Sequence, residues 1–197
     1  MKKSKFKIYT EYFKYVMEHK KNVFKACWKR RKYNKKLRIH AFTHDLSKLR
    51  PSEFIPYAEW FYGNYGVNVD KDLLIDPEVS VKHNKCKEKF DRAWEKHYKR
   101  NKHHWNHWIG KEMPLNYIDQ MICDWEGMAM KFGDSAHEFY MKNYDELDLT
   151  LETRLSLDFR LGLIGGEGLV SGITWKTYCE MIGITMEQDL KNLGYIK

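Results

Sequence analysis

Apolar residues recur every three or four positions along most of this chain, which is the spacing of one face of an α-helix. Four prolines and twelve glycines are spread over 197 residues, so few positions interrupt these segments. No set of alternating segments indicates a sheet. We therefore predict an all-α fold, a single compact helical bundle whose site is built from side chains on facing helices.

The periodicity also gives approximate helix boundaries and a domain organisation. In the first half of the chain, helices are expected over 6–30 and 35–47, and from a cap at Ser52 to Gly63. A further helix is expected over 78–108, with a break at which Asn101 caps a new helix, and another begins at Pro114. After Asn143 a helix is expected to end at Gly165, followed by two short helices at 174–183 and 185–194. We expect residues 1–142 to form the main helical domain. Residues 143–197 would be a short C-terminal helical extension packed on it.

Composition excludes several classes of protein. Aromatic residues make up 15% of the chain, which is too many for a disordered protein. The four cysteines are scattered without a CxxC pair, which argues against a disulfide framework or a thiolate zinc site. No run of eighteen apolar residues predicts a membrane span, and no signal peptide is visible. We expect a cytoplasmic protein that does not bind membranes.

Positive charge is concentrated in one segment. The net charge is +8, and the stretch Lys20–Arg38 carries ten Lys or Arg and no acid. One interpretation is a solvated helix face followed by a basic turn. The other is a positive rim that attracts an anionic substrate or a nucleic acid backbone. The sequence alone leaves both open.

Asp124 is predicted to face the core. It lies on one helix face with Tyr117, Met121 and Met128, which follow the i, i+4, i+7, i+11 pattern. A buried carboxylate is too costly without a cation, so Asp124 requires a Lys, an Arg or a metal ion.

Two further positions complete a metal-binding pattern. His19 lies on the apolar stripe of the first helix, and His44-Asp45 is followed by Leu-Ser-Lys. Together with Asp124 they form a set of two His and two Asp, which suits Mn, Fe, Co, Ni or Zn. His40, one helical turn before His44, could compete as a ligand.

A histidine-rich segment follows at RNKHHWNHW. His103 and His107, or His104 and His107, have spacings that could share a helix face, and His97 lies upstream. One interpretation is a Trp/His packing layer. The other is that His97, His103 and His107 support the metal site or hold a second metal, and that His104 contacts a phosphate.

Five motifs carry a resemblance to known proteins. They are His19, HDLSKL at 44–49, SEFIPY at 52–57, AWEKHYKRNKHHWNHW at 93–108 and MPLNYIDQMICDW at 113–125. In this combination the chain resembles the HD superfamily of metal-dependent phosphohydrolases and, more closely, a small uncharacterised family of bacteria and phages. Leu49, Lys102 and Gln120 depart from that family's pattern, but none of them is a proposed ligand. The resemblance covers 19–125, and the tail after Asn143 shows none.

The resemblance implies roles for individual residues. His19, His44, Asp45 and Asp124 would bind a divalent metal, one ion or two, and Lys48 would contact substrate phosphate. His97 and His104 match positions where two-metal relatives have further histidines. The implied function is a phosphohydrolase for a phosphorylated small molecule, first a nucleotide, in which a metal-activated water attacks phosphorus and Lys48 and His104 stabilise the developing charge.

Two alternatives come from other classes. The protein could be a binding module in which the metal is structural and the basic stretch contacts nucleic acid or protein, although nucleic acid is not the favoured partner. It could also be a di-iron oxygenase of HD type, for which the extra histidines would supply ligands. The sequence does not identify the substrate, the metal or the oligomeric state.

Overall fold

Short polar residues and prolines determine where several helices begin. The computed structural model describes residues 2–32 and 34–163. Asp76 precedes α4 (Pro77–Arg100), and its side chain accepts hydrogen bonds from the amides of Glu78 and Val79. Thr150 caps α7 (Leu151–Arg160) in the same way.

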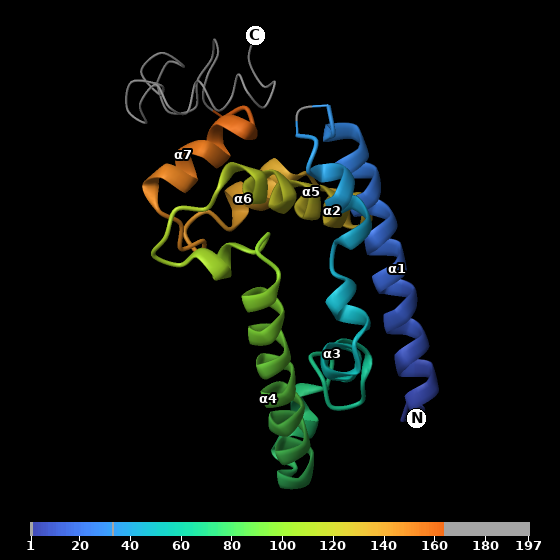
Figure 1. The fold of residues 1–197 in the computed structure, drawn as a ribbon. Helices are drawn as coiled ribbons and strands as arrows, with labels where there is room; N and C mark the ends of the chain where they lie inside the picture. The colour runs from blue at the N-terminus through green and yellow to red at the C-terminus, as the bar shows by residue number, and fades with distance from the viewer. Residues whose placement is uncertain (1, 33, 164–197) are drawn as a thin grey trace. The chain divides into compact units, whose positions relative to one another are not determined.

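The remaining α-helices are α1 (Lys5–Arg30), α2 (Leu37–Thr43), α3 (Pro51–Tyr62), α5 (Leu115–Phe132) and α6 (Ala136–Lys142) (Figure 1). Three short 3-10 helices connect them: η1 (Leu46–Leu49), η2 (Lys71–Ile75) and η3 (Trp105–Trp108). Residues 2–32 and 34–163 contain no strand, so the prediction of an all-α fold is confirmed. No helix in this part of the chain is long and apolar enough to cross a membrane.

The chain divides into two units. The first unit comprises Met1–Lys20 and Asp45–Asn101, and the second comprises Lys21–His44 and the described residues from Lys102 onward. The division falls inside α1 and again between His44 and Asp45.

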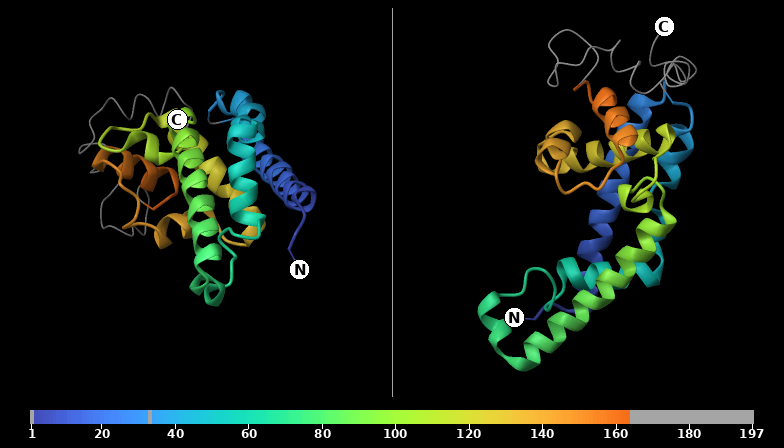
Figure 2. Two further views of the ribbon diagram at one scale, coloured as in Figure 1. Left: turned by 90° about the horizontal axis from the view of Figure 1, so that it is seen from below. Right: turned by 90° about the vertical axis from the view of Figure 1, so that its left-hand side faces the viewer.

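The core of the first unit is aromatic. Tyr12 and Val16 of α1 pack with Tyr57 of α3 and Ala93 of α4. The ring of Tyr12 meets the ring of Phe54 edge to face at 5.0 Å between centroids. Helices α3 and α4 lie side by side (Figures 1 and 2). These contacts fix the faces from which the polar residues of this unit project.

The core of the second unit is centred on α5. Ile118, Met121, Ile122 and Trp125 pack with α6 and α7, while the opposite side of α5 places Cys123 against Val23 of α1 and the residues of α2. Helix α5 ends at Gly133, whose φ of 84° is the left-handed conformation that glycine adopts readily. Because α5 is buried on most sides, a polar residue on it is held in a fixed position.

Several predicted boundaries were wrong. The helix expected over 35–47 ends at Thr43, so the His-Asp pair follows it in a turn. Ser52 does not cap α3, because the chain enters that helix one residue earlier through Pro51. Asn101 ends α4 rather than starting a new helix, because its side-chain amide donates to the carbonyl of His97.

The last part of the chain was predicted only in part. Of the helix expected after Asn143, the structure places α7 at Leu151–Arg160, while residues 145 and 146 lie in a turn and residues 147–150 belong to no regular element. The predicted end at Gly165 and the helices at 174–183 and 185–194 lie outside the described residues. The predicted boundary between 142 and 143 stays a prediction.

Candidate metal centre

Three histidines and an aspartate gather in the second unit. We call His40, His44, His103 and Asp124 the histidine cluster. The Nε2 atom of His44 lies 3.4 Å from Oδ1 of Asp124, and Nε2 of His103 lies 3.9 Å from Oδ2 of the same carboxylate. On its other side, Nδ1 of His44 lies 3.2 Å from Nε2 of His40. All four residues are buried.

The sequence builds the histidine cluster from two helices and a turn. His40 and His44 are one helical turn apart at the end of α2, so their side chains leave from the same side. Asp124 lies in the middle of α5, next to the core residues Cys123 and Trp125. His103 comes from the turn before η3, and its ring contacts the ring of His44 at 4.7 Å between centroids.

The geometry of the histidine cluster fits a divalent metal. Bonds of 2.0–2.2 Å from a metal to nitrogen or oxygen put neighbouring ligand atoms roughly 3.0–3.6 Å apart. The separation between His44 and Asp124 is inside that range, and the one between His103 and Asp124 is slightly longer. Ligand atoms of His40, His44 and His103 also come within 4.8 Å of one another. These three buried histidines can therefore hold a metal ion, and the Asp124 carboxylate lies next to two of them.

His40 lies next to the ring nitrogen of His44 that does not face Asp124. If His44 binds through the nitrogen that faces Asp124, its second ring nitrogen remains turned to His40. Metal-binding histidines use such a partner on the second nitrogen to fix their tautomer and ring orientation. His40 is therefore suited to orient His44.

Asp45 lies at the centre of the charged residues of the first unit. Its side chain is fully buried, with Oδ2 2.6 Å from Nζ of Lys48 and Oδ1 3.3 Å from Nε2 of His97. Its φ of 52° is in the left-handed region, which an aspartate tolerates better than most residues. The turn redirects the chain, so that Lys48 follows on η1 and not on a continuation of α2.

A second buried carboxylate supports His97. Oε2 of Glu53 accepts hydrogen bonds from Oγ of Ser47 at 2.7 Å and from Nδ1 of His97 at 2.8 Å. Its other oxygen accepts a hydrogen bond from Nη1 of Arg100 at 2.6 Å. We call Ser47, Glu53, His97 and Arg100 the Glu53 network. It holds the His97 ring so that its Nε2 faces Asp45.

The charges in this network shift pKa values in opposite directions. Burial acts to raise the pKa of Glu53, but hydrogen bonds from His97 and Ser47 and the positive charges of His97 and Arg100 outweigh it, so the pKa is lowered. Burial acts to lower the pKa of His97, yet the charge of Asp45 and hydrogen bonds to Asp45 and Glu53 raise it. The ion-paired forms are therefore favoured on both residues.

Sequence comparison assigns the chain to a family. The sequence model of a family of unknown function, DUF5662, matches residues 9–159, which is more than half of the chain. The chain belongs to DUF5662. The prediction of an uncharacterised family is thus confirmed, and the HD relationship stays a prediction. No curated protein and no solved structure is significantly similar to this DUF5662 protein.

The structure places the other predicted residues of this DUF5662 protein as follows. His19 is buried in the first unit, with its ring stacked on Tyr15. The ring of His104 lies 4.2 Å from that of His103, and His107 packs against Trp108. Because η3 begins only at Trp105, His103 and His107 do not share a helix face. The packing interpretation therefore describes His107 better than a ligand role does.

Sequence reasoning missed Glu53 and Arg100 and gave little weight to His40. Glu53 lies in the SEFIPY motif and Arg100 begins RNKHHW. The motifs alone predict no role for either residue. Their partnership spans 47 positions in the chain. A single sequence offers no signal for such a pair.

Proposed function

We propose that this DUF5662 protein is a cytoplasmic, metal-dependent phosphohydrolase that acts on a phosphorylated small molecule, with a nucleotide as the first candidate. One observation carries the proposal: the buried imidazoles of His44 and His103 face the carboxylate of Asp124, and the distance from His44 is one that two ligands of the same ion would have. Mixed imidazole and carboxylate donors suit Mn, Fe, Co, Ni or Zn. The assignment to the HD superfamily belongs to this proposal and rests on the sequence motifs.

The proposed ligands are those of the sequence pattern. His44 and Asp124 come from the histidine cluster, and the sequence pattern adds His19 and Asp45. When bound, the ion supplies a water of lowered pKa and positive charge next to the phosphate. Neutral histidines and ionised aspartates are the forms that bind metals, so binding should strengthen as pH rises through the histidine range.

In this proposal Lys48 contacts the phosphate of the substrate. Without a metal its ammonium pairs with the carboxylate of Asp45. A cation bound to that carboxylate would compete with Lys48, which leaves the ammonium to meet a phosphate oxygen. A lysine is suited to this because its charge is compact and its stem flexible. Its ion pair therefore links metal binding to substrate binding.

The test is phosphate release from a panel of nucleotides and sugar phosphates with Mn²⁺ added to the full chain. For Lys48→Ala at saturating Mn²⁺, we expect full metal content and turnover lowered by about 10²-fold or more. Lys96→Ala, at an exposed lysine of α4, is the matched control and should keep full activity. An active Lys48→Ala protein would refute the role of Lys48.

The same assay separates the other classes of function. If metal-loaded protein hydrolyses none of the panel, the phosphohydrolase proposal fails. A visible absorption band from two coupled irons would then favour the oxygenase, and a salt-dependent shift of nucleic acid in a gel would favour the binding module.

A further inference from the structure

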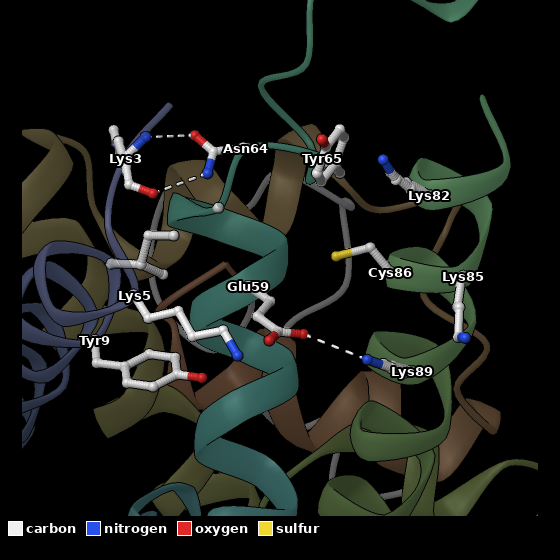
Figure 3. A pocket seen from close by; sticks show the side chains of 12 residues that line it. Lys3, Lys5, Tyr9, Glu59, Asn64, Tyr65, Lys82, Lys85, Cys86 and Lys89 are labelled. Carbon is white, nitrogen blue, oxygen red and sulfur yellow. Dashed lines mark hydrogen bonds and ion pairs between the residues drawn. The ribbon is translucent and has the colours of Figure 1, made fainter. Parts of the chain in front are cut away.

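Five lysines surround a cavity of the first unit that the proposed function does not use. The cavity has a volume of about 400 Å³, which is within the size range of small-molecule sites. Its charged lining residues are Lys3, Lys5, Lys82, Lys85, Lys89 and the single acid Glu59 (Figure 3). We call this the lysine pocket.

The fold explains why these lysines meet. Lys82, Lys85 and Lys89 follow the i, i+3, i+7 spacing along α4, so they project from one face of that helix. The opposite wall is the beginning of α1, which Asn64 pins after the end of α3. The side chain of Asn64 accepts from the amide of Lys3 at 2.7 Å and donates to its carbonyl at 3.0 Å.

Among the described residues, three of the five lysines have an acidic partner, and two do not. Lys89 is 3.6 Å from Glu59, while Lys3 and Lys82 pair with acids outside the pocket. Lys5 and Lys85 form no ion pair with any residue in 2–32 or 34–163. Lys5 and Lys85 therefore leave a net positive charge at the pocket, where Glu59 is the one acidic lining residue.

Tyr65 lies at the edge of the pocket beside two lysine side chains. A hydrogen bond from Lys2 and the charges of Lys2 and Lys82 lower the pKa of its phenol, although desolvation opposes them. The ammonium of Lys82 also lies 5.3 Å from the centre of this ring. Lys82 thus adds positive charge at this edge of the pocket.

The floor of the pocket is apolar and lies far from the Glu53 network. Ile8, Tyr9 and Cys86 line it, so an uncharged part of a ligand can be buried next to the lysines. Cys86 precedes His97 by eleven positions on the same helix. At 1.5 Å per residue, the two are about 16 Å apart along α4.

We propose that the lysine pocket binds a phosphorylated small molecule that also carries an apolar part, as a nucleoside triphosphate does. The lysines would contact the phosphates and the floor would contact the apolar part. This site is separate from the Glu53 network and needs no metal. It therefore does not depend on the proposed phosphohydrolase activity.

Calorimetric titration of the full chain with ATP and with inorganic pyrophosphate, both in EDTA, tests the proposal. EDTA removes divalent ions, so binding at a metal centre does not contribute. We expect ATP to bind, and to bind more tightly than pyrophosphate because the floor contacts its nucleoside. Lys85→Glu and, independently, Lys5→Glu should each weaken ATP binding by about tenfold or more.

Lys87→Glu is the matched control, since it makes the same charge change on α4 at an exposed residue outside the pocket. Its affinity for ATP should stay within about twofold of wild type. Thermal melting would confirm that the variants are folded, and Lys5→Glu on a different helix guards against failure of one variant.

Four results would overturn the proposal. No detectable binding of ATP to the metal-free wild type would remove the site. Equal weakening by Lys85→Glu and Lys87→Glu would mean non-specific attraction to a basic protein. Pyrophosphate binding as tight as ATP binding, or tighter binding of a single-stranded oligonucleotide that Lys85→Glu abolishes, would refute the proposed ligand class.

Discussion

Replacing Glu53 with Gln tests whether the Glu53 network stabilises the first unit. Glu53 is fully buried, and its two oxygens accept hydrogen bonds from three donors. A glutamine can present its oxygen to Ser47 and His97, but its amide group then faces the guanidinium of Arg100. In the opposite orientation the amide group faces His97. Either way, one charge-assisted hydrogen bond becomes a contact between two donors.

The expected loss of stability follows from these contacts. Removing one partner of a buried ion pair costs about 3–5 kcal/mol. The side chain of Arg100 is 44% exposed, so it can turn to water and recover part of that cost. Glutamine also keeps some of the hydrogen bonds. We therefore expect Glu53→Gln to lower the free energy of unfolding by about 2–4 kcal/mol.

Urea denaturation followed by circular dichroism, in EDTA so that metals do not contribute, measures this change. The control is Glu95→Gln, the same substitution at an exposed residue of α4 that pairs only with Lys99. It should not change stability measurably. A loss below about 0.5 kcal/mol for Glu53→Gln would refute the structural role of the network.

Two further predictions concern the second unit. A Cβ on Gly127 would lie 2.5 Å from Cγ2 and 2.9 Å from the amide nitrogen of Val23. Gly127→Ala should therefore lower the free energy of unfolding, measured by urea denaturation, by about 1–2 kcal/mol, although alanine has the better helix propensity. Unchanged or higher stability would contradict this packing. Burial raises the pKa of Asp158 in spite of its hydrogen bond with Tyr140. The free energy of unfolding should therefore fall as the pH rises from the pKa of Asp158 in the unfolded chain to its higher pKa in the folded protein. In melting experiments Asp158→Asn should therefore be more stable than wild type at about pH 7 and equal to it at about pH 3, and equal stability at both would refute the sign.

Regular helices made part of the candidate centre predictable. Asp124 was placed on the core face of its helix by periodicity alone, and the structure buries it next to two histidines. The long helix α1 was also predicted within a residue of its observed bounds. In both, the hydrophobic pattern continues over many turns, so local sequence and packing indicate the same structure.

Irregular segments were harder to predict. After α2 ends at Thr43, Asp45 turns the chain in a left-handed conformation, and no glycine marks that turn. Helix α6 was missed because it is only seven residues long, although Ser135 and Glu138 form a Ser-x-x-Glu capping pattern that was available. The partners of Glu53 depend on how α3 and α4 pack, which one sequence does not reveal.

Metal content of the purified full chain tests the central claim most directly. After loading with Mn²⁺ or Zn²⁺ and dialysis, mass spectrometry should find at least one ion per wild-type chain, and His44→Gln and Asp124→Asn should each lose it while keeping most helix content. His137→Gln and Asp134→Asn make the same changes at exposed residues of the second unit and should keep wild-type content. If the wild type holds no ion, or if the two cluster variants retain it at wild-type stoichiometry, the assignment of the metal centre is wrong.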